Sequence, residues 1–173
     1  MVILIIVHRV AVSRKKMAIG ERYLSFIIDK ENYCIDILTV KELLGMTNIT
    51  PLPKTDNYIK GVINLRGQII PIIDLRLKFG IEEIAYTKQT GIIIVEISFS
   101  GETMLMGIIV DRILEVINIA DDNISKISYI NSRIKAEYIR GIANTEDGIK
   151  IILDVLKILN SDELSLMKET VAS

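Results

Sequence analysis

The chain has 173 residues, of which half are hydrophobic, and its charge is nearly balanced, with 21 Lys and Arg against 22 Asp and Glu. This length favours one domain, or two small ones that share a core, and allows folding without disulfides or metals. Without a long basic run or an excess of positive charge, a nucleic-acid-binding surface is disfavoured. The composition leaves a protein partner or a small ligand.

The amino-acid usage predicts a mainly β protein. There are 36 Ile residues and no Trp, and β-branched side chains pack well on a pleated sheet. Cys34 is the only cysteine and lies among apolar residues, so it predicts core packing and gives no sign of an oxidising compartment.

The first sixteen residues, MVILIIVHRVAVSRKK, imitate a targeting signal but place their positive charges after the apolar stretch, which a signal peptide does not do. No apolar run approaches the ~20 residues that span a bilayer. We therefore expect a cytoplasmic protein without direct membrane insertion. Residues 1–16 are interpreted as an N-terminal extension of doubtful role, with Met17 as an alternative start; residues 2–7 also fit an extra edge strand.

The first half contains short apolar runs separated by turn signals, which is typical of barrels and sandwiches. The segment 39–45 is interpreted as a short helical or turn connection. Asn64 to Gly67 forms the predicted turn of the last hairpin, with Gly67 supplying a positive φ and Arg66 at the tip. The predicted strands are about 22–29, 33–38, 47–52, 58–64 and 68–74.

The second half repeats this scheme and then changes to helical spacing. Asn160 and Glu163 form a capping pair at the start of a helix over about 161–170. Leu164, Met167 and Val171 are spaced to face the barrels. The predicted strands are 91–99, 103–110, 113–119, 138–143 and 149–153.

An internal repeat links the two halves. The segments 58–75 and 138–155 align without a gap at an offset of 80 residues, and 34–44 aligns with 107–117 at an offset of 73. Two related halves with a boundary near Gly80 to Gly91 explain this. At the position of Arg66 the second copy has Glu146, so the hairpin itself does not require an arginine.

Catalytic and metal-binding signatures are absent from the predicted folded body. The only histidine, His8, lies in the extension, which excludes Ser-His-Asp and Cys-His sites and a zinc shell. Phosphate-binding glycine motifs and calcium loops are also missing. Asp74 and Asp154 occupy equivalent repeat positions at strand ends, where caps or turn contacts are expected; a small hydrolase that uses carboxylates or a Ser-Lys pair stays as an alternative.

The block YIKGVINLRGQIIPIIDLRLKFG, residues 58–80, resembles the CheW family of bacterial chemotaxis coupling proteins. YLSFIIDKENYCIDILTVKELL resembles the opening strands of that family, MGIIVDRILEVI its second-half signature and ILNSDELSLM its C-terminal helix, so the likeness covers about residues 22–168. The family often has glycine where Cys34 stands, and residues 1–16 match nothing in it.

The resemblance implies a fold of two intertwined SH3-like β-barrels with short helical connections. Residues 17–173 would form one CheW-like domain. Its first barrel would span about 33–80 and its second about 91–155, with the N-terminal strand and the C-terminal helix packing across them.

The resemblance also implies a non-catalytic adaptor without a cofactor or metal. Its partners would be the regulatory domain of the histidine kinase CheA and the cytoplasmic tip of chemoreceptors, and it would be recruited to membrane-associated receptor arrays. A CheW-like scaffold of a kinase pathway outside motility is the alternative within the same fold.

In the family a groove between the barrels accepts the helical tip of the receptor, an amphipathic helix in an apolar groove. Val40 and Leu43 fit core packing equally well, and Glu42 is expected near Arg66, where a bidentate pair is favourable. The kinase contact is expected on a separate surface made from barrel ends, with no residues assigned. Carried over by position, the receptor-binding residues are Ile37, Val40, Glu42, Leu43, Arg66 and Gly67.

Overall fold

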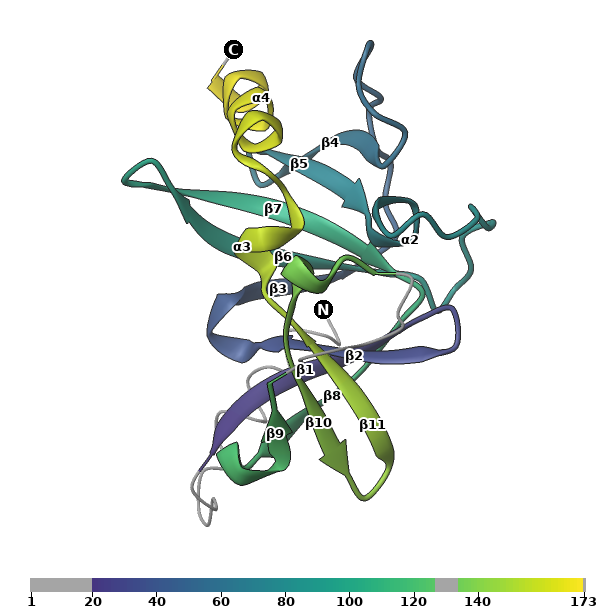
Figure 1. Ribbon diagram of the computed structural model, residues 1–173. Helices are drawn as coiled ribbons and strands as arrows, with labels where there is room; N and C mark the ends of the chain where they lie inside the picture. The colour runs from purple at the N-terminus through teal and green to yellow at the C-terminus, as the bar shows by residue number, and fades with distance from the viewer. Residues whose placement is uncertain (1–19, 127–133, 173) are drawn as a thin grey trace.

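The computed structural model describes residues 20–126 and 134–172, so the predicted extension 1–16, with His8, lies outside the described residues. Strands dominate (Figure 1). They are β1 (Glu21–Ile28), β2 (Glu31–Asp36), β3 (Val40–Gly45), β4 (Ile59–Leu65), β5 (Gln68–Asp74), β6 (Gly91–Phe99), β7 (Glu102–Val110), β8 (Arg112–Ile119), β9 (Ile124–Ser125), β10 (Ile139–Thr145) and β11 (Gly148–Leu153).

The helices are short except at the C-terminus. They are α2 (Leu75–Lys78), α3 (Val155–Ile158) and α4 (Ser161–Ala172), with 3-10 turns η2 (Ile37–Thr39), η3 (Asp121–Asn123) and η4 (Ala136–Tyr138). No helix in the described ranges is long and apolar enough to cross a bilayer.

The strands form two sheets that interleave the halves of the sequence. One sheet has the order β8-β1-β2-β11-β10-β9 and the other β3-β6-β7-β5-β4. Replacing each strand by its repeat counterpart (β1 by β6, β2 by β7, β3 by β8, β4 by β10, β5 by β11) converts one order into the other, apart from the two-residue β9. Each sheet therefore takes strands from both sides of Gly80 to Gly91, which is consistent with two intertwined barrels. The mainly β fold class is confirmed.

The register of the sheets matches the sequence repeat. β2 runs parallel to β11 with Cys34 opposite Ile152, and β5 runs parallel to β7 with Ile72 opposite Gly107. Cys34 and Gly107 are repeat equivalents, as are Ile72 and Ile152, so both junctions between the halves use the same pairing. The predicted duplication is present in the hydrogen-bond register.

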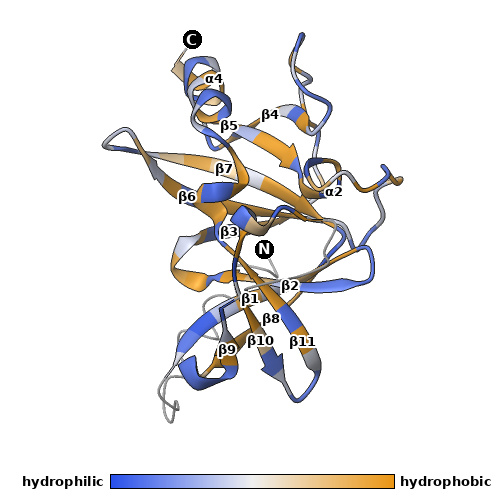
Figure 2. Cartoon of the chain, in the orientation of Figure 1, coloured by the Kyte–Doolittle hydropathy of each residue, from blue (hydrophilic) through white to orange (hydrophobic). Residues whose placement is uncertain are grey.

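The main core lies between the sheets and the helices, and a smaller cluster lies on the opposite face of each sheet. β6 illustrates this, because Ile93 and Val95 belong to the main core whereas Ile92 and Ile94 belong to the second cluster. Apolar residues accordingly run along much of β5 and β6 in Figure 2. Cys34 is fully buried in the third cluster, as core packing predicts.

Two local predictions are wrong. Segment 39–45 is mostly the strand β3, which pairs with β6 from the other half of the chain. Segment 47–52 contains only an isolated bridge between Thr50 and Val62. Pro51 interrupts this segment, since proline cannot donate to a sheet.

Gly61 allows that bridge to form. Its φ is +136°, and a Cβ on Gly61 would lie 2.0 Å from the carbonyl oxygen of Thr50. Both backbone bonds between Thr50 and Val62 measure 2.9 Å. The close backbone approach and the positive φ therefore require glycine here.

The expected caps are present. Asp74 accepts from the backbone N–H of Arg76 and Asp154 from that of Leu156, each at the start of a short helix. Asn160 and Glu163 exchange reciprocal side-chain to backbone hydrogen bonds of 2.9 and 2.7 Å, the predicted capping pair.

A cluster of polar groups joins α4 to the first half of the chain. The Nζ of Lys78 lies 2.7 Å from Oε1 of Glu163 and 4.3 Å from the ring centre of Tyr58, whose hydroxyl also donates to Glu163. Leu164 and Met167 are buried beside this cluster, as predicted, while Val171 stays 37% exposed. The start of α4 is thus held by both apolar and ionic contacts.

Candidate functional site

Arg66 lies at the tip of the β4–β5 hairpin, as predicted. Leu65 pairs with Gln68, and the two residues between them both have positive φ, 51° at Arg66 and 84° at Gly67. This is the pattern of a type I′ turn, in which the first position favours Asn, Asp or Gly. An arginine there adopts a conformation that few non-glycine residues take.

Asn64 stabilises this turn, since its Oδ1 accepts a 2.8 Å hydrogen bond from the backbone N–H of Gly67. The second hairpin is built differently: positive φ occurs at Gly148, and the hydroxyl of Thr145 donates to the Gly148 carbonyl. The two tips differ in backbone as well as in side chain, so the arginine and its turn are specific to the first half.

Glu42 faces Arg66 from β3. A register shift lies between Val40 and Glu42, and Leu43 is buried in the main core, so the Glu42 carboxylate points to the opposite face. Nη1 and Nη2 of Arg66 donate to Oε1 and Oε2 of Glu42 at 3.1 and 2.5 Å. The contact is the bidentate arrangement expected from the sequence.

The two partners differ in exposure. The Glu42 side chain is 11% exposed, whereas that of Arg66 is 71% exposed. Hydrogen bonds from Arg66 lower the pKa of the Glu42 carboxyl, although partial burial opposes the shift. The carboxylate is therefore held ionised against the sheet, and much of the guanidinium remains open to solvent.

A polar hollow of about 410 Å³ surrounds the pair. Lys41 and Glu96 form a 3.0 Å ion pair on its wall, and Ile94 comes from the second half of the chain. The hollow therefore presents charged groups of both signs beside the aliphatic side chains of Leu65 and Leu105.

Three of the six predicted site residues do not line this hollow. Val40 and Leu43 are buried in the main core, which agrees with the core-packing alternative, and Ile37 packs against the same core from η2. Glu42 and Arg66 line the hollow, with Gly67 beside them in the turn.

The sequence interpretation missed the other lining residues. Leu65 and Gln68 adjoin the predicted tip, so extending the site by one residue on each side would have found them. Ile94 and Leu105 reach the hollow only because β6 and β7 lie between β3 and β5, a pairing across halves that local periodicity does not reveal. The remaining missed residues are Lys41 and Glu96.

Two buried charged groups, Asp74 and Arg76, lie apart from this hollow and are paired. Arg76 is 7% exposed and contacts Asp111 at 2.6 Å and the carbonyl of Glu82 at 3.0 Å. Asp74, 2% exposed, accepts from Tyr86 as well as from the backbone; its burial raises the pKa of its carboxyl, although these hydrogen bonds oppose the shift. These contacts join α2 and its N-terminal cap to the segment 81–90 and to the turn between β7 and β8.

No set of three or more His, Cys, Asp or Glu side chains suited to a metal occurs in the parts of the chain that the structure describes.

Comparison with known proteins decides the family. The family model described as "CheW-like domain" matches residues 22–163. The chain belongs to the CheW-like domain family. The match includes both halves of the repeat and the start of α4.

The alignments with proteins named chemotaxis protein CheW cover most of the chain. It is 33% identical over 155 residues to the chemotaxis protein CheW of Klebsiella aerogenes, covering 90% of this chain and 91% of that protein. It is 34% identical over 142 residues to the chemotaxis protein CheW of Helicobacter pylori, covering 82% of each.

A solved CheW structure shares the fold. The crystal structure of the scaffolding protein TtCheW from Thermoanaerobacter tengcongensis is 37% identical and superposes with a TM-score of 0.75. The match covers 84% of this chain and 97% of that one.

Proposed function

We propose that this CheW-like chain is a non-catalytic adaptor of bacterial chemotaxis that couples chemoreceptors to the histidine kinase CheA. Family membership supports this role, as do similar proteins named chemotaxis protein CheW and a similar structure named a scaffolding protein. In this role the chain works in the cytoplasm and is recruited to receptor arrays at the membrane.

The observation that carries the proposal is the exposed Arg66 guanidinium held by Glu42. Two of its nitrogens donate to Glu42, and the side chain still exposes 71% of its surface. A guanidinium has five N–H donors, so several stay available to a carboxylate or carbonyl of a partner. Because Glu42 fixes its position, Arg66 loses little additional side-chain freedom when a partner binds.

The receptor partner would be a helical tip that lies across the hollow. An amphipathic helix contributes a few aliphatic contacts, and charged groups set its register. Glu42, Arg66 and Gly67 would contact it, whereas Ile37, Val40 and Leu43 would act from below by holding η2 and β3 in place. The regulatory domain of CheA would bind a separate surface.

Co-purification tests both partnerships. The chain is mixed with a receptor cytoplasmic fragment and with a CheA regulatory domain, separately and together, and binding is measured. We expect both partners to bind, and we expect Arg66→Ala to weaken binding of the receptor fragment but not binding of the CheA domain. Glu146→Ala is the matched control, because Glu146 is the exposed tip residue of the equivalent second hairpin. If the chain fails to bind the receptor fragment, or fails to bind the CheA domain, the proposal is overturned.

A further inference from the structure

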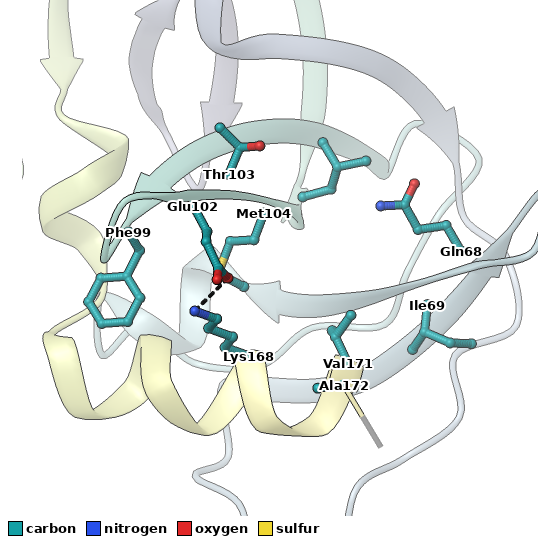
Figure 3. Close-up of a pocket in the computed structure, with 10 residues that line it drawn as sticks. Gln68, Ile69, Phe99, Glu102, Thr103, Met104, Lys168, Val171 and Ala172 are labelled. Atoms are coloured by element: carbon teal, nitrogen blue, oxygen red, sulfur yellow. Dashed lines mark ion pairs between the residues drawn. The ribbon is translucent and has the colours of Figure 1, made fainter.

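A second hollow, of about 220 Å³, lies between the end of α4 and the β6–β7 hairpin (Figure 3). We call it the α4 groove and define it by Ile69, Phe99, Met104, Leu105, Lys168 and Val171. Its lining is mainly apolar. Lys168 and Glu102 form a 2.6 Å ion pair across it, marked by the dashed line in Figure 3.

The hairpin wall of the groove has no counterpart in the other half of the protein. Beyond the equivalent residues Cys34 and Gly107, the β1–β2 hairpin continues for three residue pairs and the β6–β7 hairpin for five. The two extra pairs are Ser98 with Thr103 and Phe99 with Glu102. Three of these four residues line the groove.

The helical wall also lacks a counterpart at the equivalent position of the first half. α4 follows α3, whereas the equivalent segment after α2, residues 81–90, contains no helix and leads into β6. At the second hairpin Ile149, the counterpart of Ile69, is 64% exposed, while Ile69 beneath the groove is 36% exposed. The repeated barrel fold does not require either wall.

The α4 groove continues into the hollow of the Glu42–Arg66 pair. Gln68 and Leu105 line both. A ligand that lies over Arg66 and extends along β5 and β7 therefore reaches the apolar side chains Ile69, Met104 and Val171 next.

We propose that the α4 groove receives an aliphatic side chain of the same receptor helix that contacts Arg66. The proposal rests on the receptor-binding role given above and extends its site. The partner would be a helix with an acidic group facing Arg66 and an aliphatic residue further along, since a charged contact and an apolar contact from one helical face match the two adjoining hollows.

The physical reason is the apolar surface that the groove leaves in water. Ile69 and Val171 each expose more than a third of their area although neighbouring apolar residues surround them. An inserted aliphatic side chain would remove this surface from water at small cost in mobility, because both walls are already ordered secondary structure.

The test compares two glutamate substitutions on α4. Val171→Glu places a carboxylate in the groove. Leu166→Glu is the matched control, because Leu166 is 43% exposed on the same helix and does not line the groove. Urea unfolding first tests whether both variants are as stable as the unchanged protein. A third variant, Val171→Ala, replaces Val171→Glu if the latter unfolds.

Affinity for the receptor cytoplasmic fragment is then measured by titration calorimetry, with the CheA regulatory domain as a second ligand. We expect Val171→Glu to weaken receptor binding about 10-fold, Val171→Ala to weaken it severalfold, and Leu166→Glu to leave it unchanged. Receptor binding unaffected by both Val171 variants while Arg66→Ala weakens it would overturn the groove proposal alone. Loss of kinase binding instead would also overturn it, and no receptor binding by the unchanged chain would refute the adaptor function itself.

Discussion

Glu163→Gln should destabilise the protein strongly, because it removes the counter-charge of a lysine that water scarcely reaches. The Lys78 side chain is 8% exposed and that of Glu163 is 13% exposed. Removing one partner of a buried pair costs about 3–5 kcal/mol. Lys78 would keep the ring of Tyr58 at 4.3 Å, a contact that contributes about 0.5–2 kcal/mol. We therefore expect a loss near the lower limit, about 3 kcal/mol.

Urea unfolding followed by circular dichroism measures this loss, since the chain has no Trp for fluorescence. In thermal unfolding the same change should lower Tm by roughly 6–12 °C for a chain of this size. Glu102→Gln is the matched control. Its pair with Lys168 is as short, 2.6 Å, but the side chains are 68% and 39% exposed, and an exposed pair contributes about 0–1 kcal/mol.

The pH dependence gives a second check of the same group. Burial raises the pKa of the Glu163 carboxyl, but hydrogen bonds from Lys78 and Tyr58 outweigh it and leave the pKa below its usual value. A carboxyl with a lowered folded pKa stabilises the protein above its unfolded pKa, about 4.3, and the contribution disappears as the pH falls through the folded value. The difference between Glu163→Gln and the unchanged protein should therefore shrink in acid.

A double variant separates the charge from the cap. In Lys78→Met with Glu163→Gln both charges are gone, so most of the loss should be recovered, because neutral replacements of a buried pair are often tolerated. Equal losses of stability for Glu163→Gln and Glu102→Gln would show that burial does not strengthen the Lys78–Glu163 pair. A double variant whose loss equals the sum of the losses in Lys78→Met and Glu163→Gln would show that the two charges do not interact.

Three further predictions concern the turn, the bridge and the cysteine. Asn64→Ala should loosen the turn at Arg66 and raise the pKa of the Glu42 carboxyl toward its usual value in an NMR titration. Asn64→Asp keeps an acceptor for the Gly67 N–H and should restore the lowered pKa. An unchanged Glu42 pKa in Asn64→Ala contradicts a positioning role for Asn64. Gly61→Ala should cost at least about 2 kcal/mol in urea because of its φ and the nearby Thr50 carbonyl, and a variant of normal stability would show that this approach relaxes freely. Burial raises the pKa of the Cys34 thiol to about 12, so alkylation at pH 8 should require unfolding, and rapid labelling of the folded protein would disprove that.

The strands were predictable where local pattern and tertiary pairing agree. The β4–β5 hairpin carries its own turn residues, and Gly67 takes the positive φ expected of it. The repeat also revealed the duplication, since equivalent residues meet at both parallel junctions. The repeat did not reveal which strands exchange between sheets, because that depends on pairing between halves and not on local periodicity.

β3 shows why the remainder was missed. Its sequence, VKELLG, has helix-forming residues, and β6 supplies the hydrogen bonds that make it a strand. Arg76 was missed for a related reason: in DLRLKFG it looks like an ordinary surface residue, and only the fold brings Asp111 within 2.6 Å of it. Tertiary contacts outweigh local propensity at both positions.

At the site, the Glu42–Arg66 contact was predicted correctly from the family resemblance and is present in the structure. Ile37, Val40 and Leu43 were predicted as groove residues. They pack on or within the main core and do not line this hollow, and their contact with a receptor stays a prediction. An aliphatic residue on an alternating strand fits either face of a sheet, so sequence alone could not distinguish these roles.

The most direct test of the adaptor function is a reconstituted kinase assay. Phosphorylation of CheA is followed with receptor fragments present, and with this chain, its Arg66→Ala variant, its Glu146→Ala variant or no addition. We predict that the unchanged chain and Glu146→Ala bring the kinase under receptor control, and that Arg66→Ala does so poorly. Kinase activity that is the same with and without the chain would contradict the adaptor function.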